Sequence, residues 1–240
     1  MGMNFKTSIS VVVPVYNEAE VIEKTIQSFI MKLSDLTNDF EIVLINDAST
    51  DGTAAILKRL VSLNKNLKVF NNSKNIGSGA SLWRGLQLSS KELVMSNFAD
   101  SPFDLADLRD TLPLFENNGT DFIIIVRKDR SANSPFRKMT SYANYLLIKI
   151  LFNSRIHDFQ FVQIFRREIL KGLQIISTGT FVPPEIMFRL VFKNYKFREV
   201  KCIFYKRLDG KSKCGNLVEI FRTVKEIFYF RILTLLGFVI

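Results

Sequence analysis

The sequence is poor in the residues on which disulfide frameworks and Cys/His metal sites depend. Its 240 residues include two cysteines, Cys202 and Cys214, and one histidine, His157. Two cysteines do not make a disulfide scaffold, and a lone histidine leaves no Cys/His set for a metal such as zinc. We therefore expect a reducing compartment and, where a metal binds, oxygen ligands.

Long uninterrupted apolar runs are also missing. Met1–Ser8 is polar, and the apolar run that follows it, Ile9–Val15, is short and contains Pro14. This pattern predicts no signal peptide. No stretch reaches the roughly 18 apolar residues of a membrane-spanning helix, although the C-terminal Ile232–Ile240 comes closest.

Acidic residues are scarce in the second half of the chain. Residues 1–120 hold 11 Lys and Arg against 14 Asp and Glu, whereas residues 121–240 hold 22 against 9. Such an excess of cations suits an anionic partner, which could be nucleic acid, a phosphorylated substrate or a membrane surface. Charge alone does not choose among them. The length favours one large domain with a full core and a tail.

The first half alternates short apolar segments with helical patterns. This alternation predicts right-handed βαβ units, and hence an α/β fold with a mainly parallel central sheet and helices on both faces. The loops that follow the strands should meet at one edge of the sheet, where such folds bind ligands. Strands are predicted at Ile9–Val15, Phe40–Ile45, Leu67–Phe70, Leu93–Phe98 and Phe122–Val126, and helices at Ile22–Leu33, Thr53–Leu63, Gly79–Leu88 and Leu105–Phe115.

The rhythm changes in the second half. From Asn216, apolar residues at helical spacing predict an amphipathic helix. Three interpretations stay open for it: a helix that packs on the domain, one that lies in the membrane interface, or a short membrane-spanning segment. Beyond Arg127 and before this helix, we predict helices at Met139–Phe152, Arg167–Leu173 and Glu185–Val191 and strands at Phe159–Phe165 and Phe197–Tyr205.

Polar motifs follow the first two predicted strands. Pro14-Val15-Tyr16-Asn17-Glu18 ends the first, and Asn46–Thr53, with Asp47 at its start, ends the second. Helix capping explains parts of both motifs, but it does not explain Asp47 directly at a strand end. At a shared edge, Glu18 and Asp47 could accept hydrogen bonds from a base N–H and ribose hydroxyls.

Two further stretches suit a diphosphate. In Asn75–Gly85, Gly77 and Gly79 permit a close backbone approach at a helix N-terminus. After the fourth strand, Asp100 lies where a carboxylate would reach the sheet edge, and Asp104 is either the N-cap of the next helix or a replacement ligand.

Together these motifs resemble glycosyltransferase family 2, whose members share the nucleotide-sugar-binding GT-A fold. Val12–Glu18 resembles the family's V-x-P-x-Y-N-E segment, and Asn46–Thr53 resembles D-D-x-S-x-D-x-T with Asn46 in place of the first Asp. Asn75–Gly85 is similar to N-x-G-x-G-x-A-x-x-x-G. The resemblance implies that the following residues bind a nucleotide sugar: Pro14, Tyr16, Glu18, Asp47, Gly77, Asp100 and Arg127.

The metal-binding motif of the family has lost one of its two acids in this chain. Family members carry a D-x-D pair that binds Mg²⁺ or Mn²⁺, whereas this sequence has Phe98-Ala99-Asp100, with Pro102 two residues further on. Mg²⁺ can bind through one carboxylate plus substrate phosphates. The resemblance therefore implies Asp100 as the metal ligand and as a catalytic residue.

The later half resembles the dolichol- and polyprenyl-phosphate sugar transferase branch. Asp158-Phe159-Gln160 is similar to its D-x-Q segment, and Arg207–Lys213 matches R-x-x-G-x-S-K. This implies acceptor or phosphate binding by Arg207, Lys211, Ser212 and Lys213, although a solvated basic loop is the alternative. Glu185 falls where relatives that act on a hydroxyl carry a general base; it could instead position the donor sugar or complement the helix dipole.

The implied function is inverting, metal-dependent transfer of a sugar from a nucleotide diphosphate to a polyprenyl or dolichyl phosphate at the cytoplasmic face of an anionic membrane. We expect a domain over residues 1–213, with a nucleotide-binding half at 9–127 and an acceptor half at 128–213, and a helical tail at 214–240. One rival is a transferase of the same fold that acts on a glycan hydroxyl in surface-polysaccharide assembly. Another is a non-catalytic nucleotide-binding relative. A nucleic-acid partner is not expected.

Overall fold

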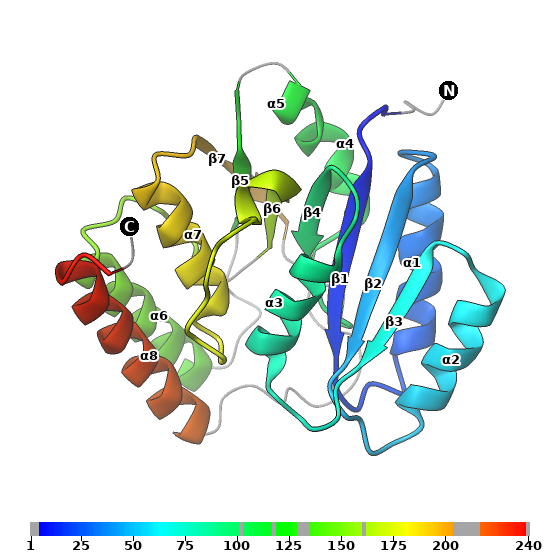
Figure 1. Ribbon diagram of the computed structural model, residues 1–240, viewed down its shortest axis with the longest axis horizontal. Coiled ribbons are helices and arrows are strands. Elements are labelled where there is room, and N and C mark those ends of the chain that lie inside the picture. Colours follow the sequence, from blue (N-terminus) through cyan, green and yellow to red (C-terminus); the bar gives the residue numbers. More distant parts are fainter. Residues whose placement is uncertain are drawn as a thin grey trace.

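The computed structural model describes residues 5–100, 103–116, 119–128, 135–159, 162–203 and 217–238. The described strands form one sheet with the order β3-β2-β1-β4-β6-β5-β7 (Figure 1). The strands are β1 (Ile9–Val15), β2 (Phe40–Asn46), β3 (Leu67–Asn71), β4 (Leu93–Ser96), β5 (Phe122–Arg127), β6 (Gln163–Arg166) and β7 (Phe197–Cys202).

Helices follow most of the strands, as the alternating pattern predicted. Their bounds are α1 (Ile22–Ser34), α2 (Thr53–Leu63), α3 (Ser78–Leu88), η1 (Leu105–Asp107), α4 (Leu108–Thr111), α5 (Pro113–Glu116), α6 (Pro135–Leu151), η2 (Arg167–Leu170), α7 (Val182–Phe192) and α8 (Leu217–Leu235).

The sheet is mainly parallel, which confirms the predicted α/β architecture. β1 pairs in parallel with β2 and β4, β2 with β3, and β5 with β7. β6 is the exception, because it runs antiparallel to both β4 and β5. In register, Val15 lies beside Asn46 and Asn46 beside Asn71, so the first three strands end together and deliver their loops to one edge.

The core has two layers, one on each face of the sheet. Successive strand residues point to opposite faces, so Val11 and Val13 join one buried cluster and Val12 joins the other. In Figure 1, α1 and α2 lie on one side of the sheet, and α3, α7, α6 and α8 lie on the other.

Several element boundaries differ from the predictions. The strand predicted over Phe159–Phe165 is β6, which begins at Gln163, and the helix predicted over Arg167–Leu173 is the shorter 3₁₀ helix η2. Prolines lie at two further differences. The helix predicted over Leu105–Phe115 is divided into η1, α4 and α5, and the division between α4 and α5 falls at Pro113, which has no N–H to donate to a carbonyl in the preceding turn. α7 begins at Val182 rather than Glu185, because Pro183 and Pro184 fit the first helical positions, where no N–H partner is needed.

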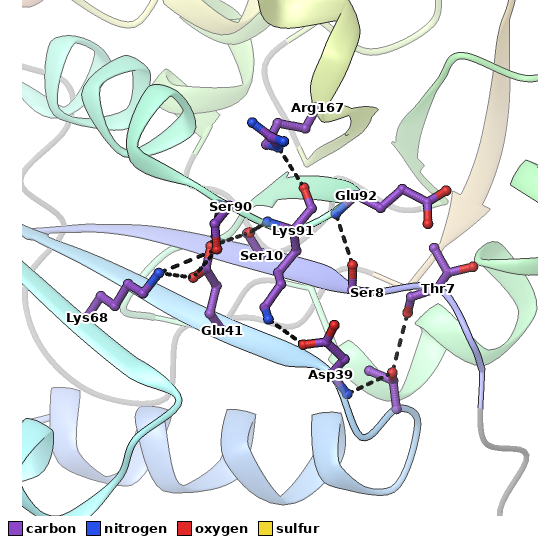
Figure 2. A network of polar contacts seen from close by, with 11 residues as sticks. Thr7, Ser8, Ser10, Asp39, Glu41, Lys68, Ser90, Lys91, Glu92 and Arg167 are labelled. Atoms are coloured by element: carbon purple, nitrogen blue, oxygen red, sulfur yellow. Dashed lines mark hydrogen bonds and ion pairs between the residues drawn. The ribbon is translucent and has the colours of Figure 1, made fainter.

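At the amino ends of the strands, Glu41 is the centre of a buried polar network (Figure 2). Its carboxylate accepts hydrogen bonds from Ser10 Oγ at 2.7 Å, Ser90 N at 2.6 Å and Ser90 Oγ at 2.9 Å, and it pairs with Lys68 Nζ at 2.6 Å. Burial raises the pKa of Glu41, but the hydrogen bonds from Lys68, Ser10 and Ser90 outweigh it and lower that pKa from 4.5 to about 2. The network joins β1, β2, β3 and the loop before β4 at the edge opposite the motifs.

The C-terminal helix α8 packs on the domain by one face and leaves the other exposed. Its Ile227 and Phe230 belong to the buried cluster that α3, α6 and α7 share, and Phe221, 73% exposed, points outward. α6 contacts α8 and carries exposed apolar residues too. We call the following set the α6–α8 surface: Tyr142, Leu146, Ile150, Val218, Phe221, Phe228, Tyr229, Ile232 and Leu235. No helix in the described part of the chain is long and apolar enough to cross a bilayer.

Candidate active site

The loops after β1 and β2 are joined by hydrogen bonds. Asn17 N–H donates to Ser49 Oγ at 3.0 Å, Thr50 N–H donates to Asn17 Oδ1 at 2.7 Å, and Glu18 N–H donates to Thr53 Oγ1 at 2.9 Å. Asn17 has a φ of 54°, a left-handed conformation that asparagine tolerates better than most residues. The two motifs therefore form one unit at the carboxyl edge of the sheet.

Helix capping accounts for Asp51 in the second loop but not for Asn17 in the first. α1 begins at Ile22, after Val21, and Asn17 gives it no side-chain cap. Asp51, by contrast, accepts from Thr53 N–H at 2.9 Å at the start of α2. Burial raises the pKa of Asp51, and the hydrogen bonds from Thr53 and Ala19 outweigh it, so the net shift is downward.

Asp47 ties a third loop to the first two. Its side chain is buried, with Oδ1 accepting from Asn72 Nδ2 at 2.8 Å and Ile76 N at 2.9 Å, and Oδ2 accepting from Gly77 N at 2.9 Å. A carboxylate has about four acceptor positions, so these three bonds leave room for a ligand N–H or O–H. Asn72, which sequence reasoning missed, is a polar residue directly after the third strand, and that position was its signal.

The two glycines at the start of α3, Gly77 at its N-cap and Gly79 in its first turn, are required for different structural reasons. Gly77 has a φ of +94°, which residues with a side chain rarely adopt. At Gly79, a Cβ would lie 1.9 Å from the carbonyl oxygen of Gly179. Gly79 thus permits contact with the protein's own backbone, whereas the sequence suggested an approach to a ligand diphosphate.

The loop after β4 carries the acids that followed the fourth predicted strand. β4 runs parallel to β1, so half-buried Asp100 lies on the same carboxyl edge as the motif loops. Asp104 is the N-cap of η1, since its Oδ1 accepts from Ala106 N–H at 2.9 Å, and it pairs with Lys32 Nζ at 2.7 Å. Of the two roles open for Asp104, the structure confirms the N-cap. Pro102 lies outside the described residues.

The acids of the described ranges do not build a metal site by themselves. Those ranges hold no group of three or more His, Cys, Asp or Glu side chains that could bind a metal ion. Asp100 is the carboxylate that the β4 loop offers in place of the D-x-D pair. A hard divalent cation would take its remaining oxygen ligands from water and from the phosphates of a bound nucleotide, so the donor set fits such an ion through the substrate.

Arg127 reaches the carboxyl edge at the end of β5, but its guanidinium is bound within the protein. Its Nε donates to Asp158 Oδ2 at 2.7 Å and its Nη2 donates to Asp158 Oδ1 at 2.9 Å. This is the bidentate geometry that an arginine uses for carboxylate or phosphate. The pair is nearly buried and joins two motifs that lie 31 residues apart.

Glu185 lies in the interior of the domain, in the first turn of α7. It has no exposed surface, and its carboxylate accepts from Ile176 N at 3.0 Å, Ser177 N at 2.8 Å and Arg189 Nε at 2.8 Å. Its position therefore fixes the loop before α7. The remaining predicted phosphate-binding residues, Arg207, Lys211, Ser212 and Lys213, lie outside the described residues.

The architecture of the sheet and its helices matches solved structures of known fold. The fold is that of GT-A glycosyltransferases, and the crystal structure of glucosyl-3-phosphoglycerate synthase from Mycobacterium tuberculosis, in complex with Mn²⁺, UDP and phosphoglyceric acid, matches it with a TM-score of 0.70. That likeness covers 95% of this chain and 78% of that one at 19% identity. At such identity it supports the fold alone.

The family follows from the sequence comparisons. The sequence model of glycosyl transferase family 2 matches residues 10–173, and the chain belongs to that family. A dodecaprenyl-phosphate galacturonate synthase from Rhizobium johnstonii is 24% identical over 91% of this chain and 65% of its own length. An undecaprenyl-phosphate 4-deoxy-4-formamido-L-arabinose transferase from Pectobacterium atrosepticum is 26% identical over 97% of this chain and 72% of its own. The chain thus spans about two thirds of the length of these relatives.

Proposed function

We propose that the protein transfers a sugar from a nucleotide diphosphate to a polyprenyl or dolichyl phosphate, with inversion at the sugar carbon. The observation that carries the proposal is the junction of three motif loops around Asp47 at the carboxyl edge of the sheet. The acceptor class is supported by relatives named for transfer to, or synthesis of, prenyl phosphates.

The donor half of the site is assigned to the loops of β1, β2 and β4. Glu18 and Asp47 would accept hydrogen bonds from the base and ribose, with Tyr16 and Pro14 shaping the loop beside them. Gly77 gives the third loop the backbone conformation that brings its amide to Asp47. Chemistry of this kind depends on holding the donor and acceptor in line and on neutralising charge.

A divalent cation, Mg²⁺ or Mn²⁺, would neutralise the leaving diphosphate when bound. Asp100 is the residue that would hold it, at the end of β4. Support comes from the loop position of Asp100 and from the neighbour of the same fold that was crystallised with Mn²⁺.

The burial of Glu185 supports a phosphate acceptor over a glycan hydroxyl. A hydroxyl needs a general base that reaches it, and Glu185 is enclosed by its own three hydrogen-bond donors. A lipid phosphate is already anionic at neutral pH and needs no base. We assign its recognition to the basic segment with Arg207, Lys211, Ser212 and Lys213, and we assign to Arg127 the orientation of that side of the site.

The α6–α8 surface is proposed to bind the cytoplasmic face of an anionic membrane. A lipid phosphate acceptor is anchored in a bilayer, so the transferase must work at its surface. The α6–α8 surface is apolar on two adjacent helices, and exposed Lys149, Arg222 and Lys225 lie on the same helices. Apolar insertion and attraction to anionic lipid act together in interfacial helices.

The transfer reaction is tested with membranes from cells that express the protein. They are incubated with a panel of radiolabelled nucleotide sugars and extracted with organic solvent, alongside membranes that carry Asp47→Asn. Label in a mild-acid-labile lipid fraction, lost in the variant, is the expected result. Label in a water-soluble glycan instead would identify a hydroxyl acceptor and refute the proposal.

The metal role is tested separately by calorimetry with UDP and GDP, with and without Mn²⁺. We expect Mn²⁺ to tighten nucleotide binding in the native protein and to have little effect in Asp100→Ala. Equal nucleotide affinity with and without Mn²⁺ in the native protein would overturn the assignment of Asp100 as a metal ligand.

Membrane binding is tested by co-sedimentation with phosphatidylcholine vesicles, with and without phosphatidylglycerol. Replacing Phe221 and Ile232 by Ser removes two large apolar groups, each of which contributes about 1.5–3 kcal/mol when fully buried, so partitioning should fall at least about tenfold. Leu63→Ser, at a residue 74% exposed on α2, is the matched control. Equal losses in the two proteins would exclude the α6–α8 surface.

A further inference from the structure

The segment at residues 176–180 lies between α7, α8 and the first turn of α3. We call it the 176–180 loop. From α7, Glu185 accepts the N–H groups of Ile176 and Ser177. The start of the loop is thereby fixed to the interior of the domain.

The middle of the loop is held by α8. Glu226 Oε1 accepts from Thr178 N at 2.9 Å and from Gly179 N at 3.0 Å. One turn earlier, Thr223 Oγ1 lies 2.7 Å from Thr180 Oγ1. A side chain at Gly179 would crowd this contact, because its Cβ would lie 3.2 Å from Glu226 Oε2.

The other side of the loop touches the glycine motif of the candidate donor site. Thr178 O accepts from Ala80 N–H at 2.9 Å, and the close approach at Gly79 is to the Gly179 carbonyl. Gly77, in turn, donates its N–H to Asp47. A continuous series of direct contacts thus runs from Glu226 through the 176–180 loop to the carboxylate at the centre of the site.

The carboxylate of Glu226 fits a role as a hydrogen-bond acceptor better than a packing role. Its Oε2 is buried and has no hydrogen-bond partner among the described residues. Enclosing a carboxylate oxygen without a partner is costly. An apolar residue could fill the same space, but it could not accept two backbone N–H groups at once.

We propose that Glu226 is a positioning residue for the donor site: it holds the Thr178–Gly179 peptide against Gly79 and Ala80, and so fixes the loop that Asp47 binds. The inference rests on the proposed function. It assigns a role in donor binding to α8, a helix that the family motifs do not include.

Replacement of Glu226 by Ala should weaken nucleotide binding about tenfold, because the hydrogen bonds that its Oε1 accepts from Thr178 N, Thr178 Oγ1 and Gly179 N are lost and the glycine motif gains freedom. Glu226→Gln keeps an acceptor oxygen and should stay within about threefold of the native affinity. The donor KM should rise in Glu226→Ala while kcat changes little. Glu116→Gln, at an exposed acid in α5, is the charge-matched control.

The experiment combines calorimetry with UDP and GDP and amide hydrogen exchange on peptides that cover residues 76–82 and 174–181. In Glu226→Ala, both peptides should exchange faster while the α1 peptide stays protected as in the native protein. Faster exchange in all peptides of Glu226→Ala would mean general destabilisation, and unchanged nucleotide affinity would mean that the loop contact has no role in binding. Either result would overturn the inference without contradicting the proposed function. A native protein that binds no nucleoside diphosphate would overturn both.

Discussion

The network around Glu41 predicts a defined loss of stability in acid. In the folded protein the pKa of Glu41 is about 2, against an ordinary value of 4.5. Because the folded-state pKa is depressed, the ionised group stabilises the fold fully above pH 4.5, and that stabilisation is lost as the pH falls toward 2. A difference of about 2.5 units corresponds to about 3 kcal/mol in the free energy of unfolding.

The perturbation is Glu41→Gln, which keeps the size of the side chain and removes its charge. At pH 7 the free energy of unfolding of the variant should be about 3 kcal/mol lower than that of the native protein. By pH 3 about 2 kcal/mol of that difference should be lost, because Glu41 is then protonated in the unfolded chain and begins to be protonated in the folded protein.

The measurement is urea unfolding followed by circular dichroism at pH 7, 5, 4 and 3, with Glu116→Gln as an exposed control. The control should follow the native curve throughout. A gap between Glu41→Gln and the native protein that stays constant from pH 7 to pH 3 would refute the reasoning, because the stabilisation would then not depend on ionisation. Nucleotide binding at pH 7 should persist in the folded variant, as the network lies at the edge opposite the site.

Three further predictions concern packing and reactivity. Gly79→Ala places a Cβ 1.9 Å from a backbone oxygen and should lower the free energy of unfolding by about 3 kcal/mol. Gly172→Ala, where the space is open but φ is +75°, should lower it by about 1 kcal/mol. Equal urea midpoints for the two variants would contradict the close contact at Gly79. Arg127→Met removes the bidentate partner of the buried Asp158 carboxylate and should lower the free energy of unfolding by about 3–5 kcal/mol. Adding Asp158→Leu should regain most of that loss, and a double variant no more stable than the single one would count against the pair. Burial, followed by the charge of Asp107, raises the pKa of Cys202 to about 11. In a Cys214→Ser background, labelling of Cys202 by iodoacetamide at pH 8 should therefore be slow until urea unfolds the chain. Fast labelling of the folded protein would show that the thiol is accessible.

Features that depend on residues close together in the sequence could be predicted from it. The strand ends at Val15 and Asn46 follow from apolar runs that stop at polar motifs, and the register of the sheet then brings those motifs together. Asp104 as an N-cap is equally local, since an aspartate before a helical pattern accepts from an N–H two residues on.

Features that depend on contacts between distant segments could not be predicted. From the sequence, Glu185 is predicted at the start of a helix and is open to a catalytic role. The backbone N–H groups of Ile176 and Ser177 that donate to its carboxylate belong to a loop with no helical or strand pattern. Glu226 is one more acid on an amphipathic helix until the chain folds, because its partners lie about 50 residues earlier. Such long-range hydrogen bonds leave no periodic trace in the sequence.

The two faces of α8 also bear on how a soluble form of the protein should be engineered. Deleting the helix would remove its apolar outer face, but it would strip away the inner face formed by Thr223, Ile227 and Phe230 as well and uncover the aromatic layer beneath. Resurfacing is the better route: polar residues at Phe221, Ile232 and similar outward positions would reduce aggregation in buffer while the helix stays seated.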